Sequence, residues 1–395
     1  MEKMTKMFTR MLWRLTLVGV ATLPCLAAEE STFKVTMPAT LIDMTMPATL
    51  GLPAAERARH FTVFSASKGL AQYNHGAVLF AFKGKLYCQW QTSRQDEDSS
   101  DTHVIYSSSV NGLTWQTPAT LAAQRDNAIV TSGGWWSDGE TLVAFVNVWP
   151  ENNNPKAGYT QYSLSKDGVS WSEFKPVTDD QGNPLSGIIE QDLKATPGGR
   201  VLTAFHRQPG LIATPYFTEH PLAIAGWQAA KFTNLPFTGP ISRELEPSWY
   251  HTPNGELVMT FRDQGSSYKI LAALSSDNGN TWTTPHISDI PDSRAKQSAG
   301  NLPDGSAFIV NNPTGTKTRM PLIISLSNNG RVFNKAFILR GEDTLPPMKY
   351  AGKYKRIGYS YPKSYIWNNA LWVSYAVNKE DIAVTQLPLP LENTE

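Results

Sequence analysis

Hydrophobic and polar residues alternate along short segments of this chain, and turn-forming glycine, asparagine and aspartate residues separate the segments. Residues 77–82, 85–90, 257–261 and 371–375 follow this pattern and are rich in branched and aromatic side chains. A period of two places every second side chain on one face, as in a β-strand. After residue 28 the sequence shows no amphipathic helical pattern of three turns or more. The pattern therefore predicts an all-β fold.

One short motif recurs between such segments. Its fullest copy is Ser-Ser-Asp-Asn-Gly-Asn-Thr-Trp at residues 275–282, and shorter copies, Gly-x-[Thr/Ser/Val]-[Trp/Phe], begin at Gly112, Gly168 and Gly330. In such a turn Asp and Ser form hydrogen bonds, Gly adopts a positive φ, and the aromatic side chain fills a gap between sheets. Alignment on the glycines places other residues opposite Asp277, so these copies look degraded: Val110, Lys166 and Asn328.

The spacing of the copies indicates the architecture. The glycines at positions 112, 168, 279 and 330 lie 56, 111 and 51 residues apart. The middle interval is about twice the others, and Gly226-Trp227 near its centre marks a copy that is otherwise erased. Such a period suits a four-stranded propeller blade. Five units and a sixth closed by both ends of the chain predict a six-bladed β-propeller, with Trp115, Trp171, Trp282 and Phe333 at equivalent places between blades; seven blades are the alternative.

The first 28 residues have the pattern of a cleaved signal peptide. Basic residues precede an apolar stretch at 15–23, and small residues at 25–28 form a cleavage site. The apolar stretch is too short to span a bilayer. We therefore expect a secreted or periplasmic protein. Lipid attachment at Cys25 is disfavoured because Pro24 precedes it.

The next segment, residues 29–58, contains Thr-Met-Pro-Ala-Thr-Leu twice, at 36–41 and 45–50. We interpret it as an N-terminal arm or a strand that completes a blade; a linker is the alternative. The propeller is then expected at residues 59–395.

Composition agrees with this fold and excludes several function classes. Glycine and proline number 28 and 27, and only 17% of the residues are charged, which is typical of a turn-rich β domain. The formal net charge of +1 becomes −2 once the four basic and one acidic residues of the leader are removed. A nearly neutral chain without a basic block is not expected to bind nucleic acid.

Cofactor chemistry finds little support in the sequence. Cys88 is the one cysteine after the leader, so no intramolecular disulfide is expected. The seven histidines lack the spacing of metal ligands, and no glycine-rich phosphate loop is present. We expect no organic cofactor and no integral membrane segment, leave a structural calcium ion open, and expect a monomer.

The residues with candidate chemistry follow position 246. Glu246 precedes a turn, segment 257–261 leads to Arg262, and the fullest motif follows. This order resembles that of the sialidase (neuraminidase) superfamily, whose propellers carry Asp-box (BNR) repeats, and the resemblance extends from about residue 70 to 385. In that family a Glu polarises a nucleophilic Tyr, and three Arg hold the carboxylate of the sugar. The resemblance implies these roles for Glu246 and Arg262.

Two further groups follow from the same resemblance. Arg319 stands where the family has its third clamp Arg, and Tyr359 or Tyr361 stands where it has its nucleophile. Arginine suits the task because its planar guanidinium binds a carboxylate bidentately, and a Tyr attacks near neutral pH when a carboxylate takes its proton. Arg262 and Arg319 should then face one mouth of the propeller. The structural alternative is that Arg262 pairs with Asp263 and that the tyrosines are packing residues.

The front of the chain departs from the family. Sialidases carry an Arg-Ile-Pro triplet in their first blade, and here His75 or Asn74 stands in place of its Arg. Candidates for the acid/base Asp are residues 96–98 and Asp101. The sequence is also similar to propeller-type uronate and rhamnose-glucuronate lyases, which use a His with Tyr and Arg, and His75 suits such proton transfer.

Weaker candidates complete the set. Arg207 ends a strand and is a candidate to line the same mouth, and Glu190 begins a strand set as Glu246 does. Residues 291–305 are either a substrate-contacting loop or a plain turn, and residues 378–381 are interpreted as a solvated turn.

The sequence thus favours an exo-acting, sialidase-like glycoside hydrolase for an acidic (sialic or uronic) sugar. Glu246 with Tyr359 or Tyr361 would carry the reaction on a glycan or polysaccharide. The alternatives are a polysaccharide lyase or rhamnose-glucuronate-cleaving enzyme that uses His75, and a non-catalytic carbohydrate-binding propeller.

Overall fold

The computed structural model describes residues 33–151 and 154–391. Residues 34–395 form one compact unit, whose described part contains 25 strands and one 3-10 turn, η1 (Glu342–Thr344). The predicted signal peptide, with Cys25, lies outside the described residues. Within these ranges we find no helix with the length and apolar character that crossing a membrane would need.

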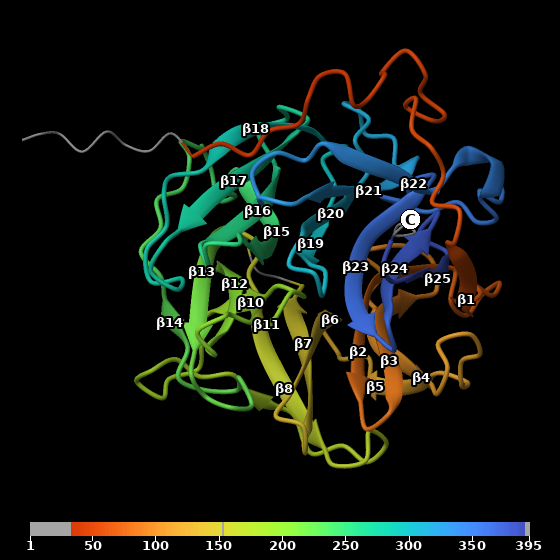
Figure 1. Ribbon diagram of the computed structural model, residues 1–395. Helices are drawn as coiled ribbons and strands as arrows, with labels where there is room; N and C mark the ends of the chain where they lie inside the picture. The colour runs from red at the N-terminus through yellow and green to blue at the C-terminus, as the bar shows by residue number, and fades with distance from the viewer. Residues whose placement is uncertain (1–32, 152–153, 392–395) are drawn as a thin grey trace, which may run out of the picture. The chain divides into compact units, whose positions relative to one another are not determined.

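The described strands form six antiparallel sheets, arranged as the blades of a β-propeller (Figure 1). This confirms the six-bladed fold that the motif spacing predicts. Blade 1 consists of β2 (Tyr73–Phe82), β3 (Lys85–Ser93), β4 (His103–Ser109) and β5 (Ala119–Ala122). Blade 2 consists of β6 (Ala128–Ser137), β7 (Leu142–Pro150), β8 (Tyr159–Ser165) and β9 (Lys175–Pro176). Blade 3 consists of β10 (Gly187–Ile189), β11 (Lys194–Ala195), β12 (Val201–Arg207), β13 (Ile212–Thr218) and β14 (Gln228–Ala229).

The other three blades follow in chain order. Blade 4 consists of β15 (Glu244–His251), β16 (Leu257–Asp263), β17 (Lys269–Ser275) and β18 (His286–Pro291). Blade 5 consists of β19 (Ser298–Asn301), β20 (Ala307–Asn311), β21 (Leu322–Ser327) and β22 (Lys335–Arg340). Blade 6 consists of β23 (Tyr359–Trp367), β24 (Ala370–Val377), β25 (Asp381–Pro388) and β1 (Arg59–Phe64).

The last blade joins the two ends of the propeller. β1 pairs antiparallel with β25, and the pairing starts with Arg59 opposite Gln386. This pairing covers the edge that β25 would otherwise expose to solvent, because a closed propeller leaves few free strand edges.

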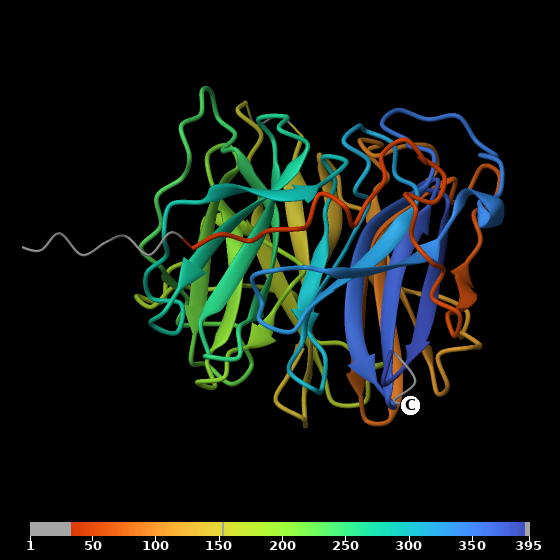
Figure 2. The same cartoon turned by 45° about the horizontal axis from the view of Figure 1, so that its top comes forward.

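The segment before β1 lies along the outer strands of blades 4 and 5 (Figure 2). The backbone N–H of Val35 donates to Nε2 of His286 at 3.1 Å. Further along, Ala54 forms an isolated bridge with Ile338. Residues 34–58 are therefore held by contacts to the propeller, next to the strand that closes it.

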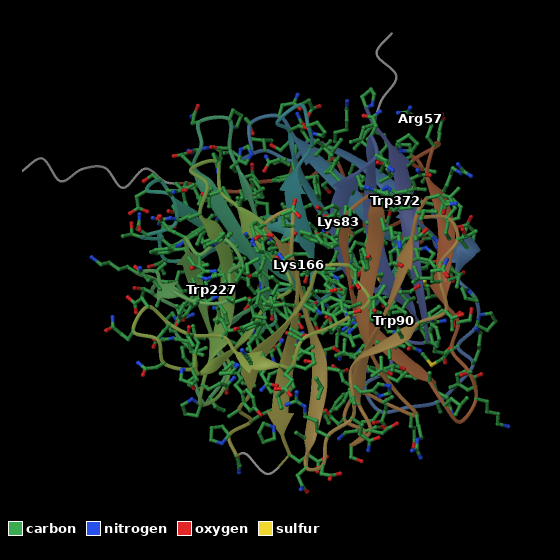
Figure 3. All side chains as sticks on the ribbon, turned by 90° about the horizontal axis from the view of Figure 1, so that it is seen from below. Arg57, Lys83, Trp90, Lys166, Trp227 and Trp372 are labelled. Atoms are coloured by element: carbon green, nitrogen blue, oxygen red, sulfur yellow. The ribbon has the colours of Figure 1, made fainter. Side chains whose placement is uncertain are left out.

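Apolar side chains pack between neighbouring blades. The indole rings of Trp90 and Trp372 belong to the cluster shared by blades 1 and 6, and Trp227 belongs to the one shared by blades 2 and 3 (Figure 3). The aromatic residues of the motifs take equivalent places, each packed toward the preceding blade: Trp115, Trp171, Trp282 and Phe333. The predicted placement between blades is confirmed.

The motif turns also correct the alignment made on the glycines. In each turn Asp or Asn stands two positions after the Ser that ends the strand, and its Oδ1 accepts backbone N–H bonds of 2.7–3.0 Å: Asn111, Asp167, Asp277 and Asn329. The turns are therefore not degraded. Three of them are one residue shorter than the turn at residues 275–282, so Ser marks the equivalent position. Gly168, with φ of 72°, packs so closely on Tyr87 that a Cβ would lie 2.0 Å from its hydroxyl oxygen.

The first strand of each blade is innermost and lines the central channel. On β2, β6 and β23 the early residues line one cavity and the later residues line a second one. The inner strands therefore all begin at the same end of the channel. We call the cavity at this end the mouth cavity; His75, Glu190, Glu246, Lys296 and Tyr361 line it.

A candidate active site in the mouth of the propeller

Two β-bulges aim the central residues of the mouth cavity. The pairing of β15 with β16 slips between Leu245 and Ser248, and that of β23 with β24 slips between Ser360 and Lys363. Glu246 and Tyr361 occupy these bulges with φ of 52° and 57°. Non-glycine residues in this region cost roughly 1–3 kcal/mol and cluster at functional sites. The two strained residues face each other across the channel.

Tyr361, Glu246 and Arg262 form one hydrogen-bonded group. The hydroxyl of Tyr361 donates to Oε1 of Glu246. Nη1 of Arg262 donates to Oε2 of Glu246 at 2.9 Å and to the Tyr361 oxygen at 3.2 Å. Burial would raise the pKa of Glu246, but the positive charges of Arg262 and Lys296 outweigh it and hold that pKa below its usual value. The carboxylate is therefore ionised beside a phenol.

The phenol itself stays protonated near neutral pH. Burial, and then the charge of Glu246, raises the pKa of Tyr361 above its ordinary value. The guanidinium carbon of Arg319 lies 5.1 Å from the centre of the Tyr361 ring, and the ammonium groups of Lys296 and Lys379 lie at 5.4 and 5.9 Å. Nε and Nη1 of the buried Arg319 have no hydrogen-bond partner among the described residues. Arg262 and Arg319 thus both approach Tyr361. That they clamp a sugar carboxylate stays a prediction.

His75 packs against the same ring. The centres of the His75 and Tyr361 rings lie 4.1 Å apart, and both nitrogens of His75 are buried without a hydrogen-bond partner in the described part of the chain. Burial, followed by the charges of Lys379, Arg319 and Lys296, holds the pKa of His75 well below its usual range. His75 is therefore a neutral imidazole in the cavity. Asn74 serves structure instead, because its amide binds two backbone carbonyls and the Trp90 indole.

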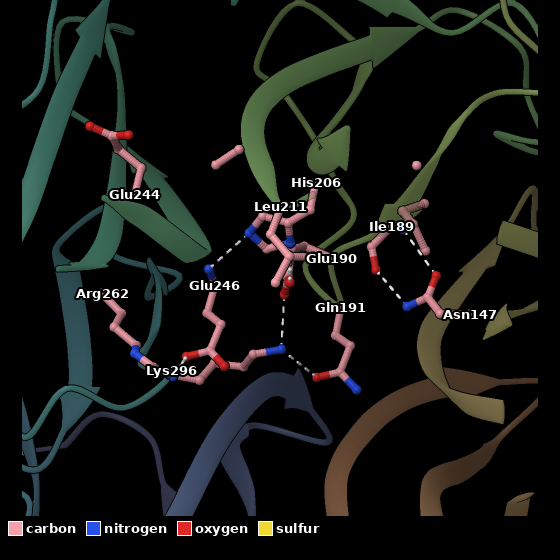
Figure 4. A network of polar contacts seen from close by, with 12 residues as sticks. Asn147, Ile189, Glu190, Gln191, His206, Leu211, Glu244, Glu246, Arg262 and Lys296 are labelled. Carbon is pink, nitrogen blue, oxygen red and sulfur yellow. Dashed lines mark hydrogen bonds and ion pairs between the residues drawn. The ribbon is translucent and has the colours of Figure 1, made fainter. Parts of the chain in front are cut away.

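A second ionic group lies on the blade 3 side of the cavity (Figure 4). Lys296 donates to Oε2 of Glu190 at 2.8 Å and to Oε1 of Gln191 at 3.0 Å. Nδ1 of His206 lies 3.0 Å from Oε1 of Glu190, and its Nε2 accepts the backbone N–H of Glu246 at 3.4 Å. An acceptor at Nε2 places the proton on Nδ1. His206 thus links the Glu190 carboxylate to the bulge that holds Glu246.

The cavity has a volume of about 210 Å³. Its rim carries Glu97 and Asp98, which are paired with Lys379 and with Lys156. An apolar wall faces them, formed by Ile129, Trp149, Ile188 and Leu211. The cavity therefore offers carboxylates, cations, a phenol and a neutral imidazole to one small ligand.

Three of the sequence candidates lie outside this group. Tyr359 belongs to the core between blades 5 and 6, where its hydroxyl is 3.0 Å from Oγ1 of Thr344, so it is not placed to act with Glu246. Asp101 accepts the backbone N–H of Arg94 at 2.9 Å and does not line the cavity; residues 97 and 98 of the same loop do. Arg207 is exposed and donates to Thr214, because β12 is not the innermost strand of its blade.

Other residues enter the site that the sequence analysis placed elsewhere or missed. The turn at 378–381 is not solvated: Lys379 is 3% exposed and reaches the mouth, and the neighbouring Glu380 is 1% exposed. Lys296 belongs to segment 291–305, for which a substrate-contacting loop and a plain turn were the two alternatives, and it lines the mouth cavity. His206 carried no distinctive motif, although Glu190 did signal the strand set beside it. Asp263 pairs with Arg243 at 2.6 Å, which leaves Arg262 free to bind Glu246.

Metal ligation finds no support in the described ranges, where no three His, Cys, Asp or Glu side chains gather so as to hold an ion. Every acidic group of the mouth cavity named above has a cation or a hydroxyl beside it instead. The arrangement suits proton transfer and the binding of an anion.

Comparison with known proteins identifies the family to which the chain belongs. The sequence pattern of the BNR repeat-like domain matches residues 84–373. A solved sialidase is similar at 18% identity with a TM-score of 0.65, over 90% of this chain but 35% of its own length, so this chain spans about a third of that protein. A protein of unknown function from Dyadobacter fermentans DSM 18053 is similar at 16% identity and a TM-score of 0.61, over 84% of this chain and 98% of that one.

A third similar structure is a leech intramolecular trans-sialidase in complex with 2,7-anhydro-Neu5Ac. It is 12% identical with a TM-score of 0.63, over 84% of this chain and 70% of its own. No curated protein matches the sequence. At these identities the solved structures show that the fold is shared.

Proposed function

We propose that this chain, which belongs to the BNR repeat-like domain family, is an exo-acting glycoside hydrolase that cleaves a terminal acidic sugar. The observation that carries the proposal is the group of Tyr361, Glu246 and Arg262, in which a buried phenol donates to an ionised carboxylate. The sialidases and the trans-sialidase to which the fold is similar support the same class of reaction.

Charge in the mouth favours an anionic substrate. Four cations surround Tyr361, namely Arg262, Arg319, Lys296 and Lys379, and three carboxylates pair with them, namely Glu246, Glu190 and Glu97. None of these three carboxylates pairs with Arg319, whose buried Nε and Nη1 have neither a negative partner nor a hydrogen-bond acceptor among the described residues. A sugar carboxylate supplies both, because a guanidinium binds it with charge-assisted hydrogen bonds.

The reaction then runs through Tyr361. As its oxygen bonds to the anomeric carbon, Glu246 takes the phenolic proton, and the bond to the leaving oxygen breaks. A neutral phenol approaches a centre beside a carboxylate without charge repulsion. The leaving oxygen must take up a proton, and we assign its delivery to Asp98, which lines the cavity, because Lys379 holds Glu97 as a carboxylate. Water then attacks the anomeric carbon and gives a proton to the Asp98 carboxylate, while the bond to tyrosine breaks and the Tyr361 oxygen takes its proton back from Glu246.

Two tyrosines two residues apart provide the test. Tyr361→Phe should lower kcat/KM on a fluorogenic sialic or uronic acid glycoside by at least about 10³-fold, because the nucleophile is removed. Tyr359→Phe is the matched control, with kcat/KM expected to be unchanged. Full activity of Tyr361→Phe would refute the proposal, and so would equal cleavage of a neutral galactoside by the native protein.

A second candidate rests on His75. A neutral imidazole with two free nitrogens beside Tyr361 suits removal of the C5 proton of a uronate, which is the chemistry of a lyase. A lyase product carries a C4–C5 double bond and absorbs in the ultraviolet, whereas a hydrolase product does not. An absorbing product that requires His75, tested with His75→Ala, would replace the hydrolase by the lyase.

Binding without turnover is the remaining outcome. If the native protein binds acidic glycans and neither Tyr361→Phe nor His75→Ala changes any product, the propeller is a carbohydrate-binding module. We also propose export by the leader predicted at residues 1–28; detection of the mature protein outside the cytoplasm, and its loss when the leader is deleted, would test this.

A further inference from the structure

The channel holds a second cavity at the far end of the inner strands, which we call the lower cavity. It has a volume of about 230 Å³, and its polar lining includes Asp192, Lys194 and Lys363. Its walls are otherwise apolar and aromatic, with Phe80, Trp135 and Tyr365. Phe80 and Tyr365 are half-buried, with their rings 5.2 Å apart, so the lower cavity has an edge toward solvent.

Gln191 separates the lower cavity from the mouth cavity, and its side chain lines both. Its Nε2 donates to the carbonyl of Gly76 at 3.0 Å and to Ser132 at 2.9 and 3.0 Å, while its Oε1 accepts from Lys296. With these bonds made, Gln191 has little capacity left for a ligand. The two cavities are therefore separate binding spaces.

Lys363 differs from the other charged groups of the lower cavity. The Nζ of Lys194 has three acceptors: the Asp192 carboxylate at 3.2 Å and the carbonyls of Trp249 and Ala299. Asp192 in turn accepts from the hydroxyl of Ser248 and the backbone of Trp249.

The Nζ of Lys363, by contrast, is buried without any hydrogen-bond partner in the described chain, and its nearest carboxylate oxygen, on Asp192, is 3.8 Å away. A buried charge is costly unless it is paired and hydrogen-bonded. Two ammonium groups share one carboxylate here, so the cluster has one positive charge to spare.

We propose that the lower cavity is a second ligand site, which binds a small organic carboxylate with an aromatic or apolar body through the ammonium group of Lys363. The carboxylate supplies the missing acceptor and the missing negative charge, and the aromatic walls bury the body of the ligand. The cavity is smaller than the roughly 300–1,000 Å³ of drug-sized sites, which favours a ligand of about the size of benzoate over an oligosaccharide.

Benzoate is therefore the probe, and benzyl alcohol is its neutral match. Calorimetric titration of the native full chain should show binding of benzoate and much weaker binding of benzyl alcohol. Lys363→Met should raise the Kd for benzoate by roughly tenfold or more, because the ligand loses its charged partner. Arg319→Met, at the mouth cavity, should leave this Kd unchanged.

Lys363→Met is expected to fold, since it replaces an unsatisfied buried ammonium by an apolar side chain of similar length. The native protein gives a second measurement that needs no variant. Burial lowers the pKa of Lys363 to about 8, with Asp192 and Glu190 opposing and Lys296 and Lys194 adding to this effect. Lys363 is charged below that pH and neutral above it, so affinity for benzoate should fall as the pH rises through about 8.

Several results would overturn the proposal. It fails if native protein does not bind benzoate, if Lys363→Met binds it as tightly as the native protein, or if benzyl alcohol binds equally well. Loss of binding in Arg319→Met with full binding in Lys363→Met would place the benzoate in the mouth cavity instead.

Discussion

Tyr359 and Tyr361 belong to the same inner strand, β23, but to two regions of the molecule that work differently. Tyr359 lies in the core between blades, where its ring packs edge-on against Tyr375 and its hydroxyl meets Thr344 and the carbonyl of Gly341. Tyr361 lies in the mouth among charged groups, and its hydroxyl meets Glu246 and Arg262. One β-bulge between Ser360 and Lys363 makes this difference.

Packing residues and site residues therefore occupy different positions along the same strand. In the core the hydroxyl of Tyr359 is satisfied by neutral partners, Thr344 and the carbonyl of Gly341, and apolar area supplies the stability. In the mouth the bulged residues have strained φ values, and nitrogens of His75 and Arg319 have no hydrogen-bond partner in the described part of the chain. The arrangement in the core stabilises the fold, whereas the arrangement in the mouth leaves polar groups available to bind a ligand.

Removal of an inter-blade aromatic residue should have the largest effect, and on stability alone. Trp282 is 7% exposed and packs between blades 3 and 4, so Trp282→Ala should lower the free energy of unfolding by about 3–5 kcal/mol. Chemical denaturation measures this value, and kcat/KM of the folded fraction should not change. Val169→Ala, at a motif position that is 67% exposed, is the control and should stay within about 0.5 kcal/mol. Loss of activity in proportion to stability would show that core and mouth are not independent.

Removal of a mouth arginine should do the opposite. Arg262→Ala should cost about 2–5 kcal/mol of transition-state binding, measured as kcat/KM, because the buried carboxylate of the substrate loses its guanidinium partner. Arg243→Ala, which breaks the neighbouring pair with Asp263, is the matched control. It should lower stability and leave kcat/KM unchanged. Equal activity losses in both variants would mean that Arg262 acts through the fold rather than through the substrate.

The smallest effect is expected at Asp292, a buried acid whose carboxyl group interacts with the charge of Arg262. Burial raises the pKa of Asp292 from 3.8 to about 6, against hydrogen bonds from Asn311 and the backbone. A raised folded-state pKa adds stability that is complete below the unfolded value and is lost as the pH rises through about 6.

Asp292→Asn removes this titration. Its free energy of unfolding relative to the native protein should therefore rise by about 2–3 kcal/mol between roughly pH 4 and pH 7. Urea denaturation of both proteins across this range measures the difference. A difference that does not change with pH would show that Asp292 is ionised in the folded protein at no cost in stability.

The motif turns and the number of blades could be predicted from the sequence alone. The motif turns depend on hydrogen bonds between residues at most five positions apart, such as the bond that the backbone N–H of Thr281 donates to Asp277. The spacing of these turns therefore predicted the six blades. The aromatic residues that end the motifs could be found for the same reason. The sequence also placed Glu246, Arg262 and Arg319 in the candidate site, because their order along the chain resembles that of a family.

Which tyrosine enters the mouth, and which side chains surround it, depends on the tertiary structure. The β-bulge at Tyr361 could not be found from residue types alone, because it is defined by how β23 pairs with β24. Lys379, Lys296 and His206 come from three different blades or connections and meet only when the propeller closes. The same closure buries the Nζ of Lys363 in the lower cavity without a hydrogen-bond partner among the described residues, because burial and charge pairing depend on residues far apart in the chain.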